Sequence, residues 1–140
     1  NAMQGALSRL ETEIQHYASR LPDALIRIGE SVGGDTGKLF LLTGQTLTDK
    51  NMISVSEAWK TSLDRNKDAL YLQKEDLDIL YRFGNQLGSS DREGQVRFIQ
   101  LTLLQLREEE LKARAIREKS EKMYRSLGLL GGIALAILLF

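Results

Sequence analysis

Residues 90–106 have the sequence SDREGQVRFIQLTLLQL. Their apolar members recur every three or four positions and so share one face of an α-helix: Val96, Ile99, Leu103 and Leu106. At the front of this stretch, Ser90 and Glu93 have the spacing of a capping box, which satisfies the free amides at a helix start. The pattern therefore predicts a long amphipathic helix that begins at the capping box.

The same apolar spacing recurs in five segments before residue 90. Pro22, the Gly33-Gly34 pair and the polar loop 49–53 separate the first four, and Gly88 ends the fifth. Ser54 and Glu57 form a further capping-box pattern in front of the fourth. The apolar residues of the successive segments are Leu7, Leu10, Ile14, Tyr17, Ala18 and Leu21; Leu25 and Ile28; Leu39, Phe40, Leu42 and Leu47; Val55, Ala58, Trp59 and Leu63; Leu77, Leu80, Tyr81 and Leu87.

Composition supports the same fold class. Leu occurs 25 times against 9 Ile and 3 Val, and helices favour Leu whereas strands favour β-branched residues. A single Pro permits long helices without a break. We therefore expect an all-α protein, an antiparallel bundle of about six helices whose long last helix continues into an apolar C-terminal tail.

Length and charge exclude several classes of protein. A chain of 140 residues is long enough for one domain with a sizeable core. The absence of Cys excludes disulfides, thiolate zinc sites and cysteine nucleophiles. Nineteen basic and 19 acidic side chains give a formal net charge of zero, which argues against a nucleic-acid partner.

The C-terminal stretch 127–140, LGLLGGIALAILLF, contains no charged residue. As a helix it spans roughly 21 Å, which is short for a bilayer core of about 30 Å and leaves a buried core helix as one interpretation. The basic stretch before it favours a membrane anchor with the preceding domain in the cytosol. The anchor residues would be Leu127, Leu129, Leu130, Ile133, Leu135, Ile137, Leu138, Leu139 and Phe140.

The basic stretch, called here the basic collar, lies within residues 112–125 and carries a net charge of +4. Its cations are Lys112, Arg114, Arg117, Lys119, Lys122 and Arg125. Within the tail, Gly128, Gly132 and Ala136 are four residues apart and form a stripe of small side chains. Such a stripe allows two membrane helices to approach closely, or it merely loosens a single helix.

The predicted domain organisation has four parts. Residues 1–3 are typical of the remnant of an expression tag, and residues 4–106 form the cytosolic bundle. Charged residues predominate from 107 to 122, so residues 107–126 form a solvated helical stalk before the anchor at 127–140. The alternative is a soluble helical adaptor or signalling bundle that homo-oligomerises through its apolar C-terminal helix.

Two features of the sequence resemble catalytic or ligand-binding motifs, but neither has all the residues that its motif requires. The run 33–38, GGDTGK, resembles a phosphate loop, but Val32 and Leu39 stand where that motif needs Gly and Ser or Thr. His16, the only His, lacks the flanking residues of phosphoacceptor histidines and has no Cys or second His for a zinc site. We therefore expect no catalytic residue, cofactor, metal or small-molecule substrate.

Surface residues are the better candidates for function. Trp59 is expected in the core, with an exposed docking role as the alternative. Arg92 stands in the first turn of its predicted helix, where a cation opposes the helix dipole, so it is a candidate for a partner-facing site. Glu57 and Asp91 are further candidates for protein contacts.

Over residues 4–140 the chain resembles the stage III sporulation protein AB family of endospore-forming bacteria. The order and spacing of several motifs carry this resemblance, rather than any single short motif. They are Leu10-Glu11-Thr12-Glu13-Ile14, Leu21-Pro22-Asp23-Ala24-Leu25, Val55-Ser56-Glu57-Ala58-Trp59, Ser62-Leu63, Phe83-Gly84-Asn85-Gln86-Leu87-Gly88, Asp91-Arg92-Glu93-Gly94-Gln95, Leu101-Thr102-Leu103 and Glu121-Lys122-Met123-Tyr124-Arg125-Ser126-Leu127-Gly128.

The resemblance implies a membrane protein of the mother cell that faces the forespore, with its main domain in the cytosol. It also implies an N-terminal hydrophobic segment, which this sequence lacks. The family is similar to the six-helix cytoplasmic domains of type II secretion and type IV pilus inner-membrane platform proteins. By that likeness, the chain would be a non-enzymatic platform of the mother cell–forespore channel. Its expected partners are the companion ATPase, stage III sporulation protein AA, other channel subunits and the membrane.

Overall fold

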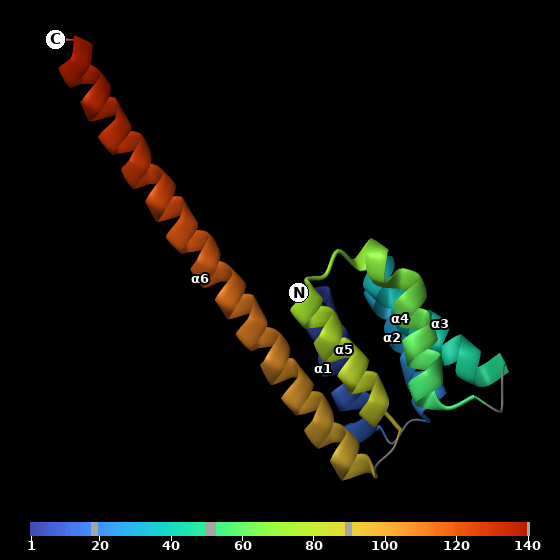
Figure 1. Cartoon of the computed structure of the whole chain (residues 1–140). Helices are drawn as coiled ribbons and strands as arrows, with labels where there is room; N and C mark the ends of the chain where they lie inside the picture. Colours follow the sequence, from blue (N-terminus) through green and yellow to red (C-terminus); the bar gives the residue numbers. More distant parts are fainter. Residues whose placement is uncertain (18–19, 50–52, 89–90, 140) are drawn as a thin grey trace. The chain divides into compact units, whose positions relative to one another are not determined.

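A computed structural model of the chain describes residues 1–17, 20–49, 53–88 and 91–139 (Figure 1). The described residues form six α-helices and no strand, which confirms the expected all-α class. The chain divides into two units, Asn1–Leu106 and Arg107–Phe140, which are treated separately below. The helices are α1 (Ala2–His16), α2 (Leu21–Val32), α3 (Gly34–Asp49), α4 (Val55–Leu70), α5 (Lys74–Gln86) and α6 (Arg92–Leu139). Three residues used in the predictions above, Ala18, Ser90 and Phe140, lie outside the described part.

Side-chain caps fix where three of the helices begin. The Asn1 side chain accepts a hydrogen bond from the Gln4 amide at 2.9 Å, so the first residues of the chain are part of α1. The Ser54 hydroxyl accepts from the Glu57 amide at 3.1 Å, as the capping-box pattern predicts.

The predicted Ser90 cap lies outside the described residues, but a neighbouring side chain caps the start of α6. The Asp91 carboxylate accepts from the Gly94 amide at 2.8 Å, and the helix begins at Arg92. Asp91 and Gly94 have the same three-residue offset as Ser90 and Glu93, and a carboxylate is also favoured by the positive end of the helix dipole.

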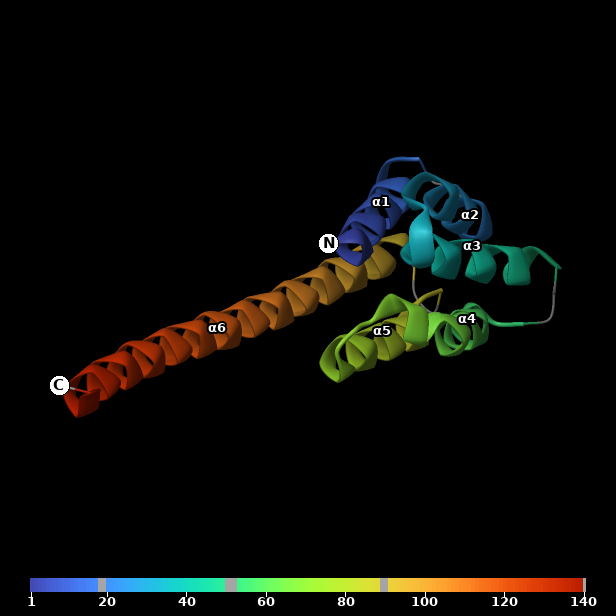
Figure 2. The same ribbon diagram turned by 90° about the horizontal axis from the view of Figure 1, so that it is seen from above.

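The first unit has two layers of helices. Figure 2 shows α1, α2 and α3 on one side and α4 and α5 on the other. The first turns of α6 lie against α1, since the Gln100 amide donates to the Glu11 carboxylate at 2.9 Å. They also lie against α5, where the rings of Phe83 and Phe98 stack with centroids 6.5 Å apart.

Trp59 is fully buried at the centre of this unit, as expected. Its ring meets Phe40 and Phe83 edge-on, at centroid distances of 5.4 and 5.3 Å. The indole Nε1 donates to the Leu80 carbonyl at 2.8 Å, so the polar atom of the ring keeps a partner inside the core. One side chain thus joins α3, α4 and α5.

Close approach of α2 and α3 depends on glycine. A Cβ atom on Gly29 would lie 2.6 Å from the Leu41 amide nitrogen, and one on Gly37 would lie 2.5 Å from the Gly29 carbonyl oxygen. The turn between the two helices uses positive φ angles at Gly33 (67°) and Gly34 (63°), which glycine adopts readily. Residues 33–37 therefore form the turn and the first residues of α3 in a helix hairpin made by α2 and α3.

The second unit consists of α6 from Arg107 onward. Two ion pairs brace it along its own axis, Lys112–Glu109 at 3.3 Å and Arg114–Glu110 at 3.2 Å. Every described side chain from 121 to 139 is exposed. In the described chain, α6 alone contains an 18-residue window apolar enough to cross a membrane, with mean hydropathy 1.4 and none of the window buried.

Candidate functional site

The three residues predicted to face partners lie at the N-termini of two helices of the first unit. The N-termini of α4 and α6 both lie at one end of this unit (Figure 1). Gly88, after α5, lies close to the start of α4, because a Cβ atom on it would lie 2.9 Å from the Val55 side chain. Glu57 then lies in the first turn of α4, while Asp91 and Arg92 open α6; all three are exposed. We call this surface the α4–α6 end.

Beside Arg92, a small groove of about 250 Å³ separates α6 from α1. It is lined by Gln15, Arg92, Glu93, Val96, Arg97 and Gln100. The sequence analysis singled out Arg92 but not Arg97, the second arginine of the groove. Gln15 belongs to α1, so it joins this groove only because α6 packs against α1.

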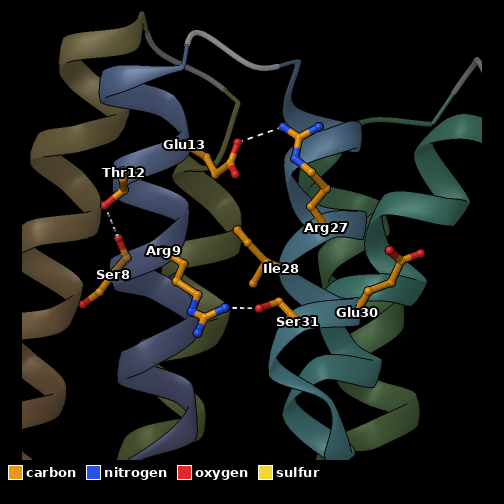
Figure 3. A pocket seen from close by; sticks show the side chains of 8 residues that line it. All are labelled: Ser8, Arg9, Thr12, Glu13, Arg27, Ile28, Glu30 and Ser31. Atoms are coloured by element: carbon orange, nitrogen blue, oxygen red, sulfur yellow. Dashed lines mark hydrogen bonds and ion pairs between the residues drawn. The ribbon is translucent and has the colours of Figure 1, made fainter.

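A larger groove, of about 690 Å³, lies between α1 and α2. Figure 3 shows its eight lining residues: Ser8, Arg9, Thr12, Glu13, Arg27, Ile28, Glu30 and Ser31. Two side-chain links cross it. Arg27 donates to the Glu13 carboxylate at 2.7 Å, and Arg9 donates to the Ser31 hydroxyl. The buried side chain of Ile28 lies between the links (Figure 3).

The two arginines of this groove have different electrostatic surroundings. The hydrogen bond and the charge of Glu13 raise the pKa of the Arg27 guanidinium above its ordinary value. Arg9 has the neutral Ser31 hydroxyl as its hydrogen-bond partner and no carboxylate within ion-pair distance among the described residues. Neither arginine belongs to a motif predicted above, although Arg9 and Glu13 are four residues apart on one helix, a spacing at which side chains interact.

The second unit carries the other candidate surface. Lys112 and Arg114 of the basic collar pair with glutamates one turn earlier. The remaining four collar cations have no salt bridge to a described residue: Arg117, Lys119, Lys122 and Arg125. Beyond them, the predicted anchor residues 127–139 are exposed, and nothing lies within 4 Å of an added Cβ at Gly128 or Gly132. This unit therefore presents a cationic stretch followed by an apolar one.

Groups associated with catalysis are dispersed. Among residues 1–17, 20–49, 53–88 and 91–139, no cluster of three His, Cys, Asp or Glu side chains could hold a metal ion. In the run 33–38, Gly37 is buried against α2 and Lys38 is exposed. Glu11 and Glu13 hydrogen-bond to different helices, through Gln100 and Arg27.

Comparison with known proteins gives a consistent result. A family model described as stage III sporulation protein AB matches residues 1–140. Stage III sporulation protein AB of Bacillus subtilis (strain 168) is 36% identical over 137 residues, which is 98% of this chain and 80% of that protein. A solved structure of a stage III sporulation protein AB is similar with a TM-score of 0.74 and 32% sequence identity, over 83% of this chain and 91% of that chain.

Proposed function

The chain belongs to the stage III sporulation protein AB family, and from this membership we propose that it is a non-enzymatic, membrane-anchored platform of the channel complex between mother cell and forespore. Its bundle would lie in the mother-cell cytosol, at the membrane that faces the forespore. There it would hold a cytosolic ATPase, stage III sporulation protein AA, and other channel subunits in position.

The observation that carries the proposal is that the first unit buries its apolar residues in a core, whereas the second unit exposes its own. The first unit has a closed core around Trp59 and exposes charged residues to its surroundings. The second unit has no core, since its apolar residues from Leu127 to Leu139 are exposed on a single helix. Exposed apolar surface of this extent needs a lipid or protein environment. Because the collar cations precede it, a membrane with anionic headgroups supplies both kinds of contact.

For the ATPase we propose docking at the α4–α6 end. Arg92 supplies a cation, and Glu57 and Asp91 supply anions, and all three are exposed at helix N-termini. Mixed charges of this kind fix the orientation of a partner and increase the rate of association.

Liposome flotation tests the anchor. The full chain is expected to float with vesicles that contain anionic lipid, while a chain that ends at residue 126 stays in the aqueous fraction. Equal recovery of both chains in the aqueous fraction would instead support a soluble adaptor that buries its apolar helix in a homo-oligomer. The exposed tail is also the observation that favours this second candidate.

Co-purification with the companion ATPase tests the docking surface. We expect the full chain in detergent to retain the ATPase and Arg92→Glu to weaken retention. Arg65→Glu is the matched control, because Arg65 is also exposed but lies beyond the first turns of α4, away from its N-terminus. Equal retention by all three chains would remove Arg92 from the docking surface.

A further inference from the structure

Beyond residue 112, α6 carries a largely apolar seam with the spacing of a coiled coil. Side chains that alternate at intervals of three and four residues share one face of a helix, and such a repeat of seven is the pattern by which two helices pack side by side. In α6 this repeat runs without interruption from residue 113 to residue 137, and every member beyond Ser120 is exposed. The seam consists of Ala113, Ile116, Ser120, Met123, Leu127, Leu130, Ala134 and Ile137.

The charges beside this seam have one sign. In a coiled coil the positions next to the seam, on its two sides, carry the charges that choose the partner. Within the basic collar, the charged residues at these flanking positions are Lys112, Arg117 and Lys119. Lys112 is paired with Glu109 at 3.3 Å, whereas Arg117 and Lys119 have no salt bridge to a described residue. The two glutamates of the collar, Glu118 and Glu121, do not occupy flanking positions. The seam is therefore bounded by cations on both sides.

These charges disfavour a second copy of the chain as the partner. Two copies whose tails enter one membrane from the same side run parallel. A parallel pair brings each flanking residue close to the flanking residue of the next heptad on the other helix. Lys112 of each copy would then lie opposite Arg117 of the other copy. Like charges in such positions destabilise the pair, whereas acidic residues on a partner helix would stabilise it.

The geometry of α6 also favours a helix over a lipid surface as the partner. The described part of α6 is one unbroken helix, so a tail inserted in a membrane directs the preceding turns away from the bilayer (Figure 1). Ala113 lies roughly 21 Å along the axis from Leu127, which is well beyond the Debye length of about 8 Å. A helix that lies on a membrane presents a wide apolar face, whereas an apolar stripe confined to the heptad seam is narrow.

We infer that the seam between Ala113 and Met123 pairs with a helix of another protein, whose own heptad seam is flanked by acidic residues. Arg117 and Lys119 would pair with these acidic residues, while Ile116 and Met123 pack into the partner's seam. The inference rests on the proposed function, because the membrane anchor is what holds this part of α6 outside the bilayer. It concerns the second unit alone, whereas the proposed ATPase docking surface belongs to the first.

Binding of a synthetic helical peptide to the full chain in neutral detergent micelles tests the inference. The probe has four heptads with Leu at the seam positions and Glu at the flanking positions, and the control probe carries Lys in place of Glu. Fluorescence anisotropy of the labelled peptides measures the dissociation constants. We expect the Glu probe to bind at least about tenfold more tightly than the Lys probe, because several exposed charge pairs change sign together.

Two pairs of variants locate the binding on the seam. Ile116→Asn is expected to weaken binding of the Glu probe at least about tenfold, because it removes a seam side chain. Leu111→Asn is its matched control, since the two side chains are similarly exposed, 68% for Ile116 and 64% for Leu111, but Leu111 lies opposite the seam. Arg117→Glu should weaken the Glu probe about fivefold and tighten the Lys probe, which a damaged structure could not do. Arg125→Glu, also opposite the seam, should change neither.

Three results would overturn the inference. One is a Glu probe that does not bind, or that binds no better than the Lys probe. Another is an equal effect of Ile116→Asn and Leu111→Asn. The third is a dimer of the unchanged chain in sedimentation that Ile116→Asn dissociates and Leu111→Asn does not, which would identify a second copy as the occupant. Liposome flotation tests the anchor without the probes, and the probes are measured without a bilayer, so the two proposals fail separately.

Discussion

At the scale of single residues, the core depends on a contact that only glycine allows. The face of α5 that meets Trp59 carries Gly84, and a Cβ atom there would lie 2.2 Å from Trp59 Cδ1. That atom cannot be accommodated by a side-chain rotation alone, because the indole is held between Phe40 and Phe83 and is hydrogen-bonded to Leu80. The Phe83-Gly84 pair thus determines how closely α5 approaches α4.

Gly84→Ala is expected to lower the free energy of unfolding by about 2–3 kcal/mol, because an overpacked core displaces side chains and backbone. Denaturant unfolding of the full chain in mild detergent, followed by the fluorescence of the single Trp, measures it. Gly5→Ala is the matched control. Nothing lies within 4 Å of its added Cβ in α1, so stability should rise by about 0.5–1 kcal/mol. Equal effects at both positions would contradict the close contact.

Tyr81 gives a prediction about pH. Burial and a hydrogen bond to Asp64 raise the pKa of its phenol to about 12, from an ordinary value of 10.0. Between these two values the unfolded chain loses the Tyr81 proton while the folded chain keeps it, so the folded state binds more protons and stability falls as pH rises. Below pH 10 the phenol is protonated in both states, so the contribution of Tyr81 to the free energy of unfolding is fully present.

The ultraviolet titration of the chain minus that of Tyr81→Phe should show one phenol ionising near pH 12. Unfolding measured from pH 9 to 12 should be less dependent on pH in Tyr81→Phe. A difference titration centred near pH 10 would mean that Asp64 and the neighbouring packing do not hold this proton.

At the scale of elements, a side-chain hydrogen bond fixes the starts of α1, α4 and α6. The effect of a cap on stability can be measured separately from a contact with a partner. Asp91 is both the cap of α6 and a candidate for the docking surface. The carboxylate serves the cap through an acceptor oxygen, which an amide also possesses. It serves a partner through its charge, which an amide lacks.

Asp91→Ala is therefore expected to lower the free energy of unfolding by about 1 kcal/mol, and Asp91→Asn to leave it nearly unchanged. Thermal melts of the full chain in detergent measure both. If Asp91 also contacts the ATPase, Asp91→Asn will weaken co-purification without a change in melting temperature. A loss of stability in Asp91→Asn equal to that in Asp91→Ala would show that the charge, and not the acceptor, stabilises α6.

At the scale of the whole molecule, the two units are stabilised by different surroundings. The first has its own aromatic and aliphatic core, whereas the second is a helix whose apolar end is exposed. The proposed anchoring at a membrane would have two components, the burial of apolar residues and the attraction of the collar cations to anionic headgroups.

The cationic component should be sensitive to salt. Binding to vesicles with anionic lipid is expected to weaken as ionic strength rises from about 0.1 M to 0.5 M, because the Debye length shortens. Replacement of Lys119, Lys122 and Arg125 by Gln should weaken binding by about 1 kcal/mol per cation and reduce the salt dependence. Vesicle co-sedimentation measures both. Binding to neutral vesicles that is equally strong and unaffected by salt would contradict a role for the collar.

Much of the fold follows from local pattern. Apolar residues spaced three and four apart, a Pro, paired glycines and a Ser54 cap predict helices, because helix formation and capping depend on neighbours in the chain. The pattern was less reliable for detail. It omitted Ile79 and Phe83 from the inward face of α5, where both are buried.

The sequence alone therefore determined the helical class and the number and order of the helices. It also determined the contrast between the bundle and the apolar C-terminal stretch that follows the basic collar. It also determined family membership, because motif order survives where individual motifs are short. Only the tertiary structure decided which side chains meet across helices. Arg9 and Ser31 are 22 positions apart, and Glu13 and Arg27 are 14 apart. No local periodicity relates such residues, because their contact depends on how α1 packs against α2.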